Sequence, residues 1–195
     1  MTGYPRKSKM KQAIIIGSAS CVFDDFDAAV AAIGVNFDLC AVKYAGVFWP
    51  GEIDYWISLH PEKLQPFVEE RGRRGHPPAR RIIVHRQQMD REVGRWKYPI
   101  NAEVYPEFRW VENGSSGSSS LYAVKCLLKD GYERIVLCGC PMDKTVMHLE
   151  PNATPRFAKS TEHFKRGWQQ ALPEIRDKVY SMSGWTRDLL GEPSW

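Results

Sequence analysis

Short apolar runs alternate along the chain with longer segments in which apolar residues recur at helical spacing. The runs predict strands buried on both faces of a sheet, and they lie at 13–17, 38–43, 54–59, 81–85, 134–138 and 178–182. Helical spacing predicts helices over 23–33, from Pro61 to about residue 70, over 121–130, over 160–176 and over 183–191. Strands that alternate with helices favour an α/β fold with a mostly parallel sheet and helices on both faces.

The helix predicted over 23–33 has a clear apolar face and an acidic start. The face is expected to point into the core and consists of Phe23, Phe26, Val30 and Ile33. The first turns carry Asp24, Asp25 and Asp27. Carboxylates at a helix start complement the helix dipole. We therefore interpret the three aspartates as helix-start charges and not as metal ligands.

Four segments lie outside this alternation. Residues 1–12 are basic and polar, and they predict a solvated tail ahead of one domain that spans 13–195. Residues 44–51 contain two glycines and a proline and predict a loop. Residues 71–81 contain five arginines, and we interpret them as a solvated linker in preference to a surface that steers anions. Residues 86–111 have no clear period and predict a long excursion, either a lid or a partner surface.

Composition and charge exclude several classes of protein. The chain has 195 residues, of which 43% are hydrophobic and 26% charged, and its net charge is +4. This mild positive charge does not favour nucleic acid as a partner. No apolar run approaches the length of a membrane span, and residues 1–12 lack the apolar core of a signal peptide, so a cytoplasmic location is expected. Five cysteines, an odd number, favour free thiols over a disulfide framework.

Two familiar catalytic chemistries are not predicted. Cys138 and Cys140 are only two residues apart and no paired histidines accompany them, so they are expected to be buried thiols and not zinc ligands. The chain has no Gly-x-Ser-x-Gly elbow, which argues against a serine hydrolase. A general base would come from His148 or His163, because histidine titrates near neutral pH.

A run of small residues precedes the helix that contains Leu121. Ser115, Ser116 or Ser118 is expected to cap this helix. A glycine-rich loop at a helix N-terminus exposes backbone N–H groups at the positive end of the helix dipole, where anions bind. The alternative is an ordinary capped helix with a flexible serine-rich connection. The residues that would hold the anion are Gly114, Ser115, Ser116, Gly117 and Ser118.

Other polar residues follow the ends of predicted strands, where open α/β sheets bind their ligands. Lys43 follows the second strand, and it would either meet a phosphate or be a surface charge. His60 follows the third strand, and it would either contact a ligand or be a structural hydrogen-bonding residue. The first strand ends at Gly17, and the turn after it lacks the full dinucleotide fingerprint, so NAD is not expected.

Residues 13–20, 41–46, 55–62 and 114–143 resemble small Rossmann-like proteins that are often encoded by tailed phages and prophages. The same order of motifs resembles the bacterial sialyltransferases that use CMP-sialic acid, and the pterin diphosphokinase-like proteins. The resemblance implies a Rossmann-like fold, with His148 as the general base. It also implies that a nucleotide would contact Gly17, Ser18, Ser20, Ser116, Gly117, Ser118, Gly139 and Asp143. The chain departs from these families in having one glycine and no proline after the first strand, and two extra residues between Gly139 and Asp143.

The sequence thus predicts a protein that binds a nucleotide or nucleotide sugar of the CMP type, with sialyltransferase-like glycosyl transfer as its reaction. Lys43 and His60 would join the residues of the resemblance in the site, and no metal is expected. The alternative is a non-enzymatic phage protein, a virion component or host-interaction factor, that keeps the fold as a scaffold. Its location would then be the host cytoplasm or the virion.

Overall fold

A computed structural model describes residues 10–85, 101–105, 118–151 and 154–194. Seven parallel strands form one sheet in the order β5-β4-β3-β2-β1-β6-β7. The strands are β1 (Gln12–Ile16), β2 (Asp38–Val42), β3 (Tyr55–Ser58), β4 (Arg81–His85), β5 (Ala102–Tyr105), β6 (Arg134–Cys138) and β7 (Val179–Ser181). The predicted α/β, Rossmann-like fold is confirmed.

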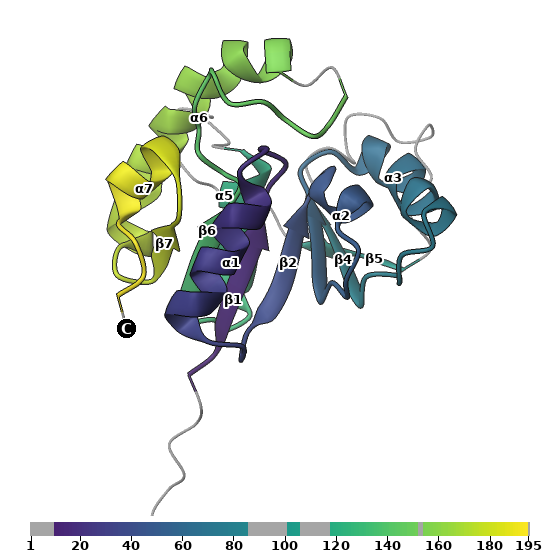
Figure 1. Ribbon diagram of the computed structural model, residues 1–195, viewed down its shortest axis with the longest axis horizontal. Helices are drawn as coiled ribbons and strands as arrows, with labels where there is room; N and C mark the ends of the chain where they lie inside the picture. The colour runs from purple at the N-terminus through teal and green to yellow at the C-terminus, as the bar shows by residue number, and fades with distance from the viewer. Residues whose placement is uncertain (1–9, 86–100, 106–117, 152–153, 195) are drawn as a thin grey trace, which may run out of the picture.

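Helices cover both faces of this sheet (Figure 1). Against one face pack α1 (Val22–Ile33), α2 (Ala45–Phe48) and α3 (Pro61–Arg73), and against the other pack α5 (Ser119–Lys129), α6 (Thr154–Ile175) and α7 (Gly184–Leu190). Strand residues alternate between the two layers, because successive side chains of a strand point to opposite faces. In β1, Ile14 and Ile16 pack with α1, whereas Ala13 and Ile15 pack with α5.

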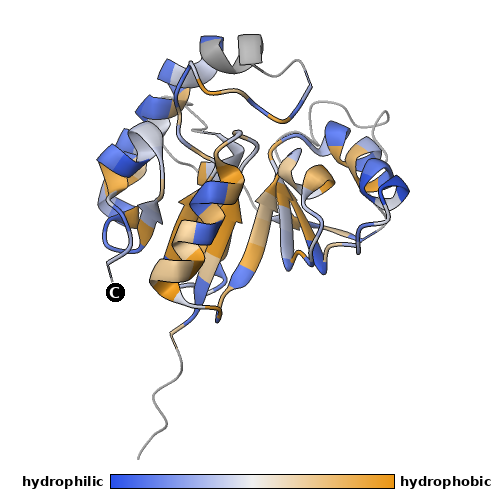
Figure 2. Ribbon diagram, in the orientation of Figure 1, coloured by the Kyte–Doolittle hydropathy of each residue, from blue (hydrophilic) through white to orange (hydrophobic). Residues whose placement is uncertain are grey.

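The apolar strands lie at the centre of the molecule and the charged residues lie on the outer helix surfaces (Figure 2). Buried parallel strands of this kind are apolar throughout, which explains why their short runs were readable in the sequence. Among the described helices, none is both long enough and apolar enough to span a membrane.

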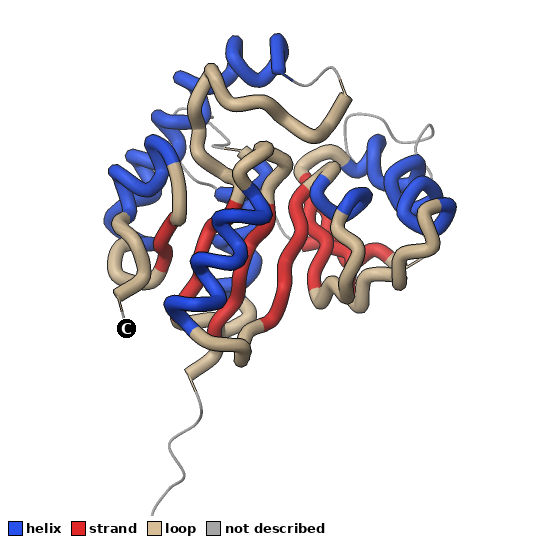
Figure 3. Tube along the Cα trace, viewed as in Figure 1, coloured by secondary structure: helices blue, strands red, loops and turns tan. Residues whose placement is uncertain are grey.

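The strand order reverses between β1 and β6. From β1 the chain builds outward through β2, β3, β4 and β5, and it then returns to place β6 on the other side of β1. In open α/β sheets such a reversal leaves a crevice at the carboxyl ends of the strands, where ligands bind. The loops that follow the strands gather at this edge, which is the upper edge in Figure 3.

Several element boundaries differ from the prediction. Residues 45–48, predicted as part of a loop, form the short helix α2, and α6 begins at Thr154 instead of residue 160. The predicted excursion over 86–111 contains β5, which pairs with β4. The remainder of that excursion, together with residues 1–9 of the predicted tail, lies outside the described residues.

The arginine-rich segment over 71–81 is a solvated linker only in part: residues 74–80 connect α3 to β4 and most of them are exposed. Helix α3 continues through Arg73, and Arg71 is buried with 2% of its surface exposed. Its guanidinium donates hydrogen bonds to the backbone carbonyls of Gly46, Trp49, Gly51 and Pro77. The other arginines pair with carboxylates: Arg73 and Arg74 with Glu70, Arg80 with Glu52 and Asp54, and Arg81 with Glu103 and Asp130.

The start of α1 also differs from the prediction. Phe23 is 46% exposed, whereas Asp25 is only 7% exposed. The Asp25 carboxylate accepts hydrogen bonds from the Gly139 N–H at 2.8 Å and from the Ser183 hydroxyl at 2.6 Å. Asp25 therefore ties the loop after β6 and the start of α7 to α1, and it is more than a charge at the helix start.

Candidate functional site

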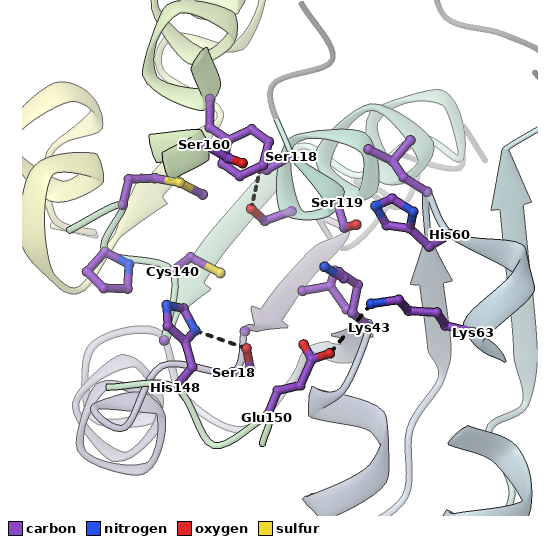
Figure 4. A pocket seen from close by; sticks show the side chains of 18 of the residues that line it. Ser18, Lys43, His60, Lys63, Ser118, Ser119, Cys140, His148, Glu150 and Ser160 are labelled. Atoms are coloured by element: carbon purple, nitrogen blue, oxygen red, sulfur yellow. Dashed lines mark hydrogen bonds and ion pairs between the residues drawn. The ribbon is translucent and has the colours of Figure 1, made fainter. Parts of the chain in front are cut away.

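A cavity of about 700 Å³ opens at the carboxyl edge of the sheet, beside the reversal of strand order (Figure 4). Its walls are the loops after β1, β2, β3 and β6, the first turn of α5, the segment around residues 148–151, and two residues of α6. A cavity of this size is typical of small-molecule sites, which span about 300–1,000 Å³.

The cavity brings together most of the predicted site residues that the structure describes. Those that line it are Gly17, Ser18, Lys43, His60, Ser118, Gly139 and His148. Four others, Gly114, Ser115, Ser116 and Gly117, lie outside the described residues. Ser20 and Asp143 do not line the cavity, and Ser20 is exposed. The Asp143 carboxylate accepts hydrogen bonds from the N–H and hydroxyl of Thr145, and these lower the pKa of Asp143.

Most of the backbone N–H groups in the turn between β1 and α1 are already engaged. Four of them donate to protein carbonyls: Gly17 to Cys138, Ala19 to Gly139, Ser20 to Met147 and Val22 to Ala19. Those of Ser18 and Cys21 donate to no group in the described residues. In dinucleotide-binding folds these N–H groups hold the diphosphate. The chain instead uses them to hold the loop after β6 and the segment around residue 148.

The glycines of this turn have a packing role. A Cβ atom on Gly17 would lie 2.2 Å from the carbonyl oxygen of Gly139. Gly139 has a φ of +66°, and a Cβ there would lie 2.6 Å from the Cβ of Val22. Both positions require glycine because two backbones approach closely, and at Gly139 also because of its left-handed conformation.

Residues 147–149 cross the β1–α1 turn and are held against it. Ser20 N–H donates to Met147 O at 2.9 Å and Leu149 N–H donates to Ser18 O at 2.7 Å, with an antiparallel bridge between Ala19 and His148. The Ser18 hydroxyl also lies 3.2 Å from His148 Nδ1. These contacts fix the His148 ring at the cavity wall, and burial lowers its pKa. His148 is consequently neutral at pH 7. The other candidate base, His163, is exposed on α6 and outside the cavity lining.

Lys43 is a half-buried cation at the end of β2. Its side chain extends into the cavity, toward Ser119 in the view of Figure 4. Burial lowers the pKa of Lys43. The ammonium has neither an ion pair within 4.0 Å nor a hydrogen bond in the part of the chain that the structure describes. A buried charge without a partner is costly, so this lysine is suited to an anionic ligand.

Two carboxylates and a second lysine complete the polar side of the cavity. Glu62 accepts a 3.0 Å hydrogen bond from His60 Nδ1, and Glu150 lies 3.9 Å from Lys63 Nζ. Burial, followed by the nearby Lys43 charge, lowers the pKa of His60. With both cavity histidines neutral, the four charged side chains sum to zero. The cavity thus offers separate positive and negative positions.

The N-terminus of α5 forms another wall. Ser118 is the N-cap, and its hydroxyl accepts a 3.3 Å hydrogen bond from the Leu121 N–H, which confirms one of the three predicted caps. Ser118, Ser119 and Ser120 all line the cavity. The positive end of the helix dipole therefore faces the same space as Lys43.

Backbone strain is concentrated around the cavity. Among described non-glycine residues, four have positive φ values: Lys43 (50°), Ser118 (124°), Met142 (50°) and Asp177 (63°). Three of these four, all except Asp177, line the cavity. Such conformations cost about 1–3 kcal/mol each and cluster at binding and catalytic sites. Their location is independent evidence that the cavity is functional.

The cysteines and metal chemistry contribute little here. Cys140 lines the cavity, but burial raises the pKa of its thiol to about 12, so it is protonated and a poor nucleophile at neutral pH. All five cysteines are free thiols, as predicted, and Cys138 and Cys140 are both buried. Within the described residues, no group of three or more histidine, cysteine, aspartate or glutamate side chains is arranged to hold a metal ion.

Comparison with family models, curated proteins and solved structures found no match to this chain. The chemistry of the cavity therefore rests on its own residues.

The sequence analysis did not predict three charged residues of the cavity: Glu62, Lys63 and Glu150. Glu62 and Lys63 follow directly after His60-Pro61, so the ligand position predicted for His60 was a usable signal for both. For Glu150 no such signal existed, because the segment that carries it reaches the cavity only through its pairing with the β1–α1 turn.

Proposed function

We propose that this protein binds a phosphate ester of the nucleotide class, a nucleotide or a nucleotide sugar, in the cavity at the carboxyl edge of its sheet. The observation that carries the proposal is Lys43, a half-buried ammonium with no ion pair among the described residues, beside the N-terminus of α5. A phosphate oxygen at this position would neutralise the lysine and accept hydrogen bonds from the helix N-terminus.

A ligand with one phosphate suits the cavity better than one with a diphosphate. In a dinucleotide fold the N–H groups of the β1–α1 turn would bind a second phosphate. Here those of Gly17, Ala19 and Ser20 donate instead to Cys138, Gly139 and Met147. Many NAD-binding proteins place an acidic residue at the carboxyl end of β2, where it binds the ribose. In this chain Lys43 lies at that position. Both features favour a nucleoside monophosphate or its sugar ester, the CMP type.

Glycosyl transfer from such a sugar ester is the reaction we propose. An acceptor oxygen would attack the anomeric carbon, and the bond from that carbon to the phosphate oxygen would break. The nucleotide would then leave with its added negative charge near Lys43. His148 is our candidate for the general base that takes the acceptor's proton, since it is neutral at pH 7 and fixed at the cavity wall.

A thermal-shift screen with matched ligands tests the proposal. The panel is CMP, UMP, CMP-sialic acid, CDP and NAD, with cytidine as the control that lacks phosphate. A ligand at 100 times its dissociation constant adds about 2.7 kcal/mol of stability, which is a shift of several degrees for a chain of this length. We expect shifts with the monophosphates and their sugar ester and none with cytidine at the same concentration. Equal responses to CMP and cytidine, or none to any member of the panel, would contradict the proposal and favour the scaffold alternative.

A further inference from the structure

Glu150 receives no hydrogen bond from the residues that the structure describes. Its side chain lines the cavity and is only 18% exposed. It pairs with Lys63 at 3.9 Å, which is beyond hydrogen-bond distance, and its carboxylate accepts no hydrogen bond from the described residues. An ionised carboxylate has about four acceptor positions, and buried polar groups are rarely left without donors. The donors it lacks are therefore expected on a ligand.

The position of Glu150 is fixed before a ligand arrives. Leu149, the residue directly before Glu150, donates its N–H to Ser18 O at 2.7 Å. The Ser20 to Met147 bond, at 2.9 Å, and the bridge between Ala19 and His148 hold the same segment. A carboxylate on a segment held in this way binds without the entropy cost of ordering a loop.

The charges around Glu150 select the kind of donor. Lys63 Nζ lies 3.9 Å from the Glu150 carboxylate, and Lys43 lines the same cavity (Figure 4). A cationic group on the ligand would be repelled by both ammonium groups. The described residues also hold no group of three or more histidine, cysteine, aspartate or glutamate side chains that could bind a divalent metal at Glu150. A neutral hydroxyl donates a hydrogen bond without this repulsion.

We propose that Glu150 is a specificity-determining residue that accepts hydrogen bonds from ligand hydroxyls, so that the cavity selects phosphate esters of polyols, such as the ribose phosphate of a nucleotide. The inference rests on the proposed phosphate position at Lys43. It adds a second contact point with the opposite charge, contributed by another part of the chain. Together the two points distinguish a sugar phosphate from a simple alkyl phosphate of equal charge.

Calorimetric titrations with small phosphate esters test this selectivity. The probes are ribose 5-phosphate, propyl phosphate and phosphoethanolamine, measured on the wild-type chain and on Glu150→Ala, Glu150→Gln and Glu133→Ala. Glu133 is an exposed control just before the amino end of β6. A hydrogen bond to a charged group contributes about 1.5–3 kcal/mol, so wild type is expected to bind ribose 5-phosphate about 10- to 100-fold more tightly than propyl phosphate.

Glu150→Ala is expected to reduce this preference to within about threefold, and to leave the affinity for propyl phosphate unchanged or higher because a negative charge is removed. Glu133→Ala is expected to keep the full preference. An equal preference in wild type and both Glu150 variants would overturn the role of Glu150 while the phosphate site stands. Tighter binding of phosphoethanolamine than of ribose 5-phosphate would overturn the hydroxyl assignment. Absence of binding by all three esters would instead overturn the phosphate site itself.

Discussion

Replacing Arg71 with methionine is expected to lower the free energy of unfolding by about 3 kcal/mol or more, because it leaves two buried and two partly buried carbonyls without their donor. The guanidinium holds the connection between α2 and β3, with bonds of 2.8 Å to Gly46 O and 2.7 Å to Trp49 O and Gly51 O. A further bond from its Nε reaches Pro77 O. No methionine atom can replace these donors. The measurement is urea unfolding followed by circular dichroism.

Arg73→Met is the matched control, since Arg73 lies on the same helix but is 72% exposed. Its ion pair with Glu70 at 2.8 Å is on the surface, and such pairs contribute at most about 1 kcal/mol. Arg71→Lys is expected to behave more like Arg71→Met than like wild type, because an ammonium cannot reproduce the fork of the guanidinium. A loss below about 1 kcal/mol in Arg71→Met would show that water or local repacking satisfies the carbonyls.

Replacing Lys43 with methionine is expected to weaken the binding of CMP about 10- to 100-fold, the cost of losing one charge-assisted contact of about 1.5–3 kcal/mol. Stability without ligand is expected to stay the same or increase. Burial makes the pKa of Lys43 lower in the folded protein than in the unfolded chain, so at pH 7 the charged ammonium opposes folding. A gain in stability together with a loss of affinity is the signature of a residue kept for binding. Calorimetric titration and thermal unfolding of the same samples measure both quantities.

Lys178→Met is the control for Lys43→Met. Lys178 is exposed and directly precedes β7, so it lies at the amino edge of the sheet, away from the cavity. It is expected to leave the affinity for CMP unchanged. Lys43→Arg keeps the charge and is expected to retain part of the affinity. An equal loss in Lys43→Met and Lys178→Met would mean that general electrostatic attraction, and not a defined site, holds the nucleotide.

The fold was readable from the sequence because its determinants are local. The runs at 13–17 and 134–138 are apolar enough to indicate strands buried on both faces, and the strands end within a residue of those limits. The helix predicted over 121–130 ends at Lys129, and Gly131 follows its C-cap directly with a φ of +82°, a conformation that suits glycine. Residues 45–48 escaped prediction because a four-residue helix has too few positions to show a period.

The site was less readable because long-range contacts build it. The positions of Lys43 and His60 followed from the rule that ligands bind at strand ends, and both line the cavity. Asp143 follows β6 in the sequence, but its side chain bonds to Thr145 and lies outside the cavity lining. No local pattern shows that residues 147–149 pair with residues 18–20, so Glu150 could not be placed. The burial of Arg71 was hidden for the same reason, since three of its four carbonyl partners, Gly46, Trp49 and Gly51, lie at least 20 residues earlier in the chain.

A crystal structure of the protein with CMP would show where the phosphate lies. We expect a phosphate oxygen at hydrogen-bond distance, about 3 Å, from Lys43 Nζ and beside the first turn of α5. The ribose hydroxyls would face Glu150. A phosphate bound instead on the turn between β1 and α1, at the N-terminus of α1, would contradict the account. It would mean that the bonds from Ala19 and Ser20 to Gly139 and Met147 open when a nucleotide binds.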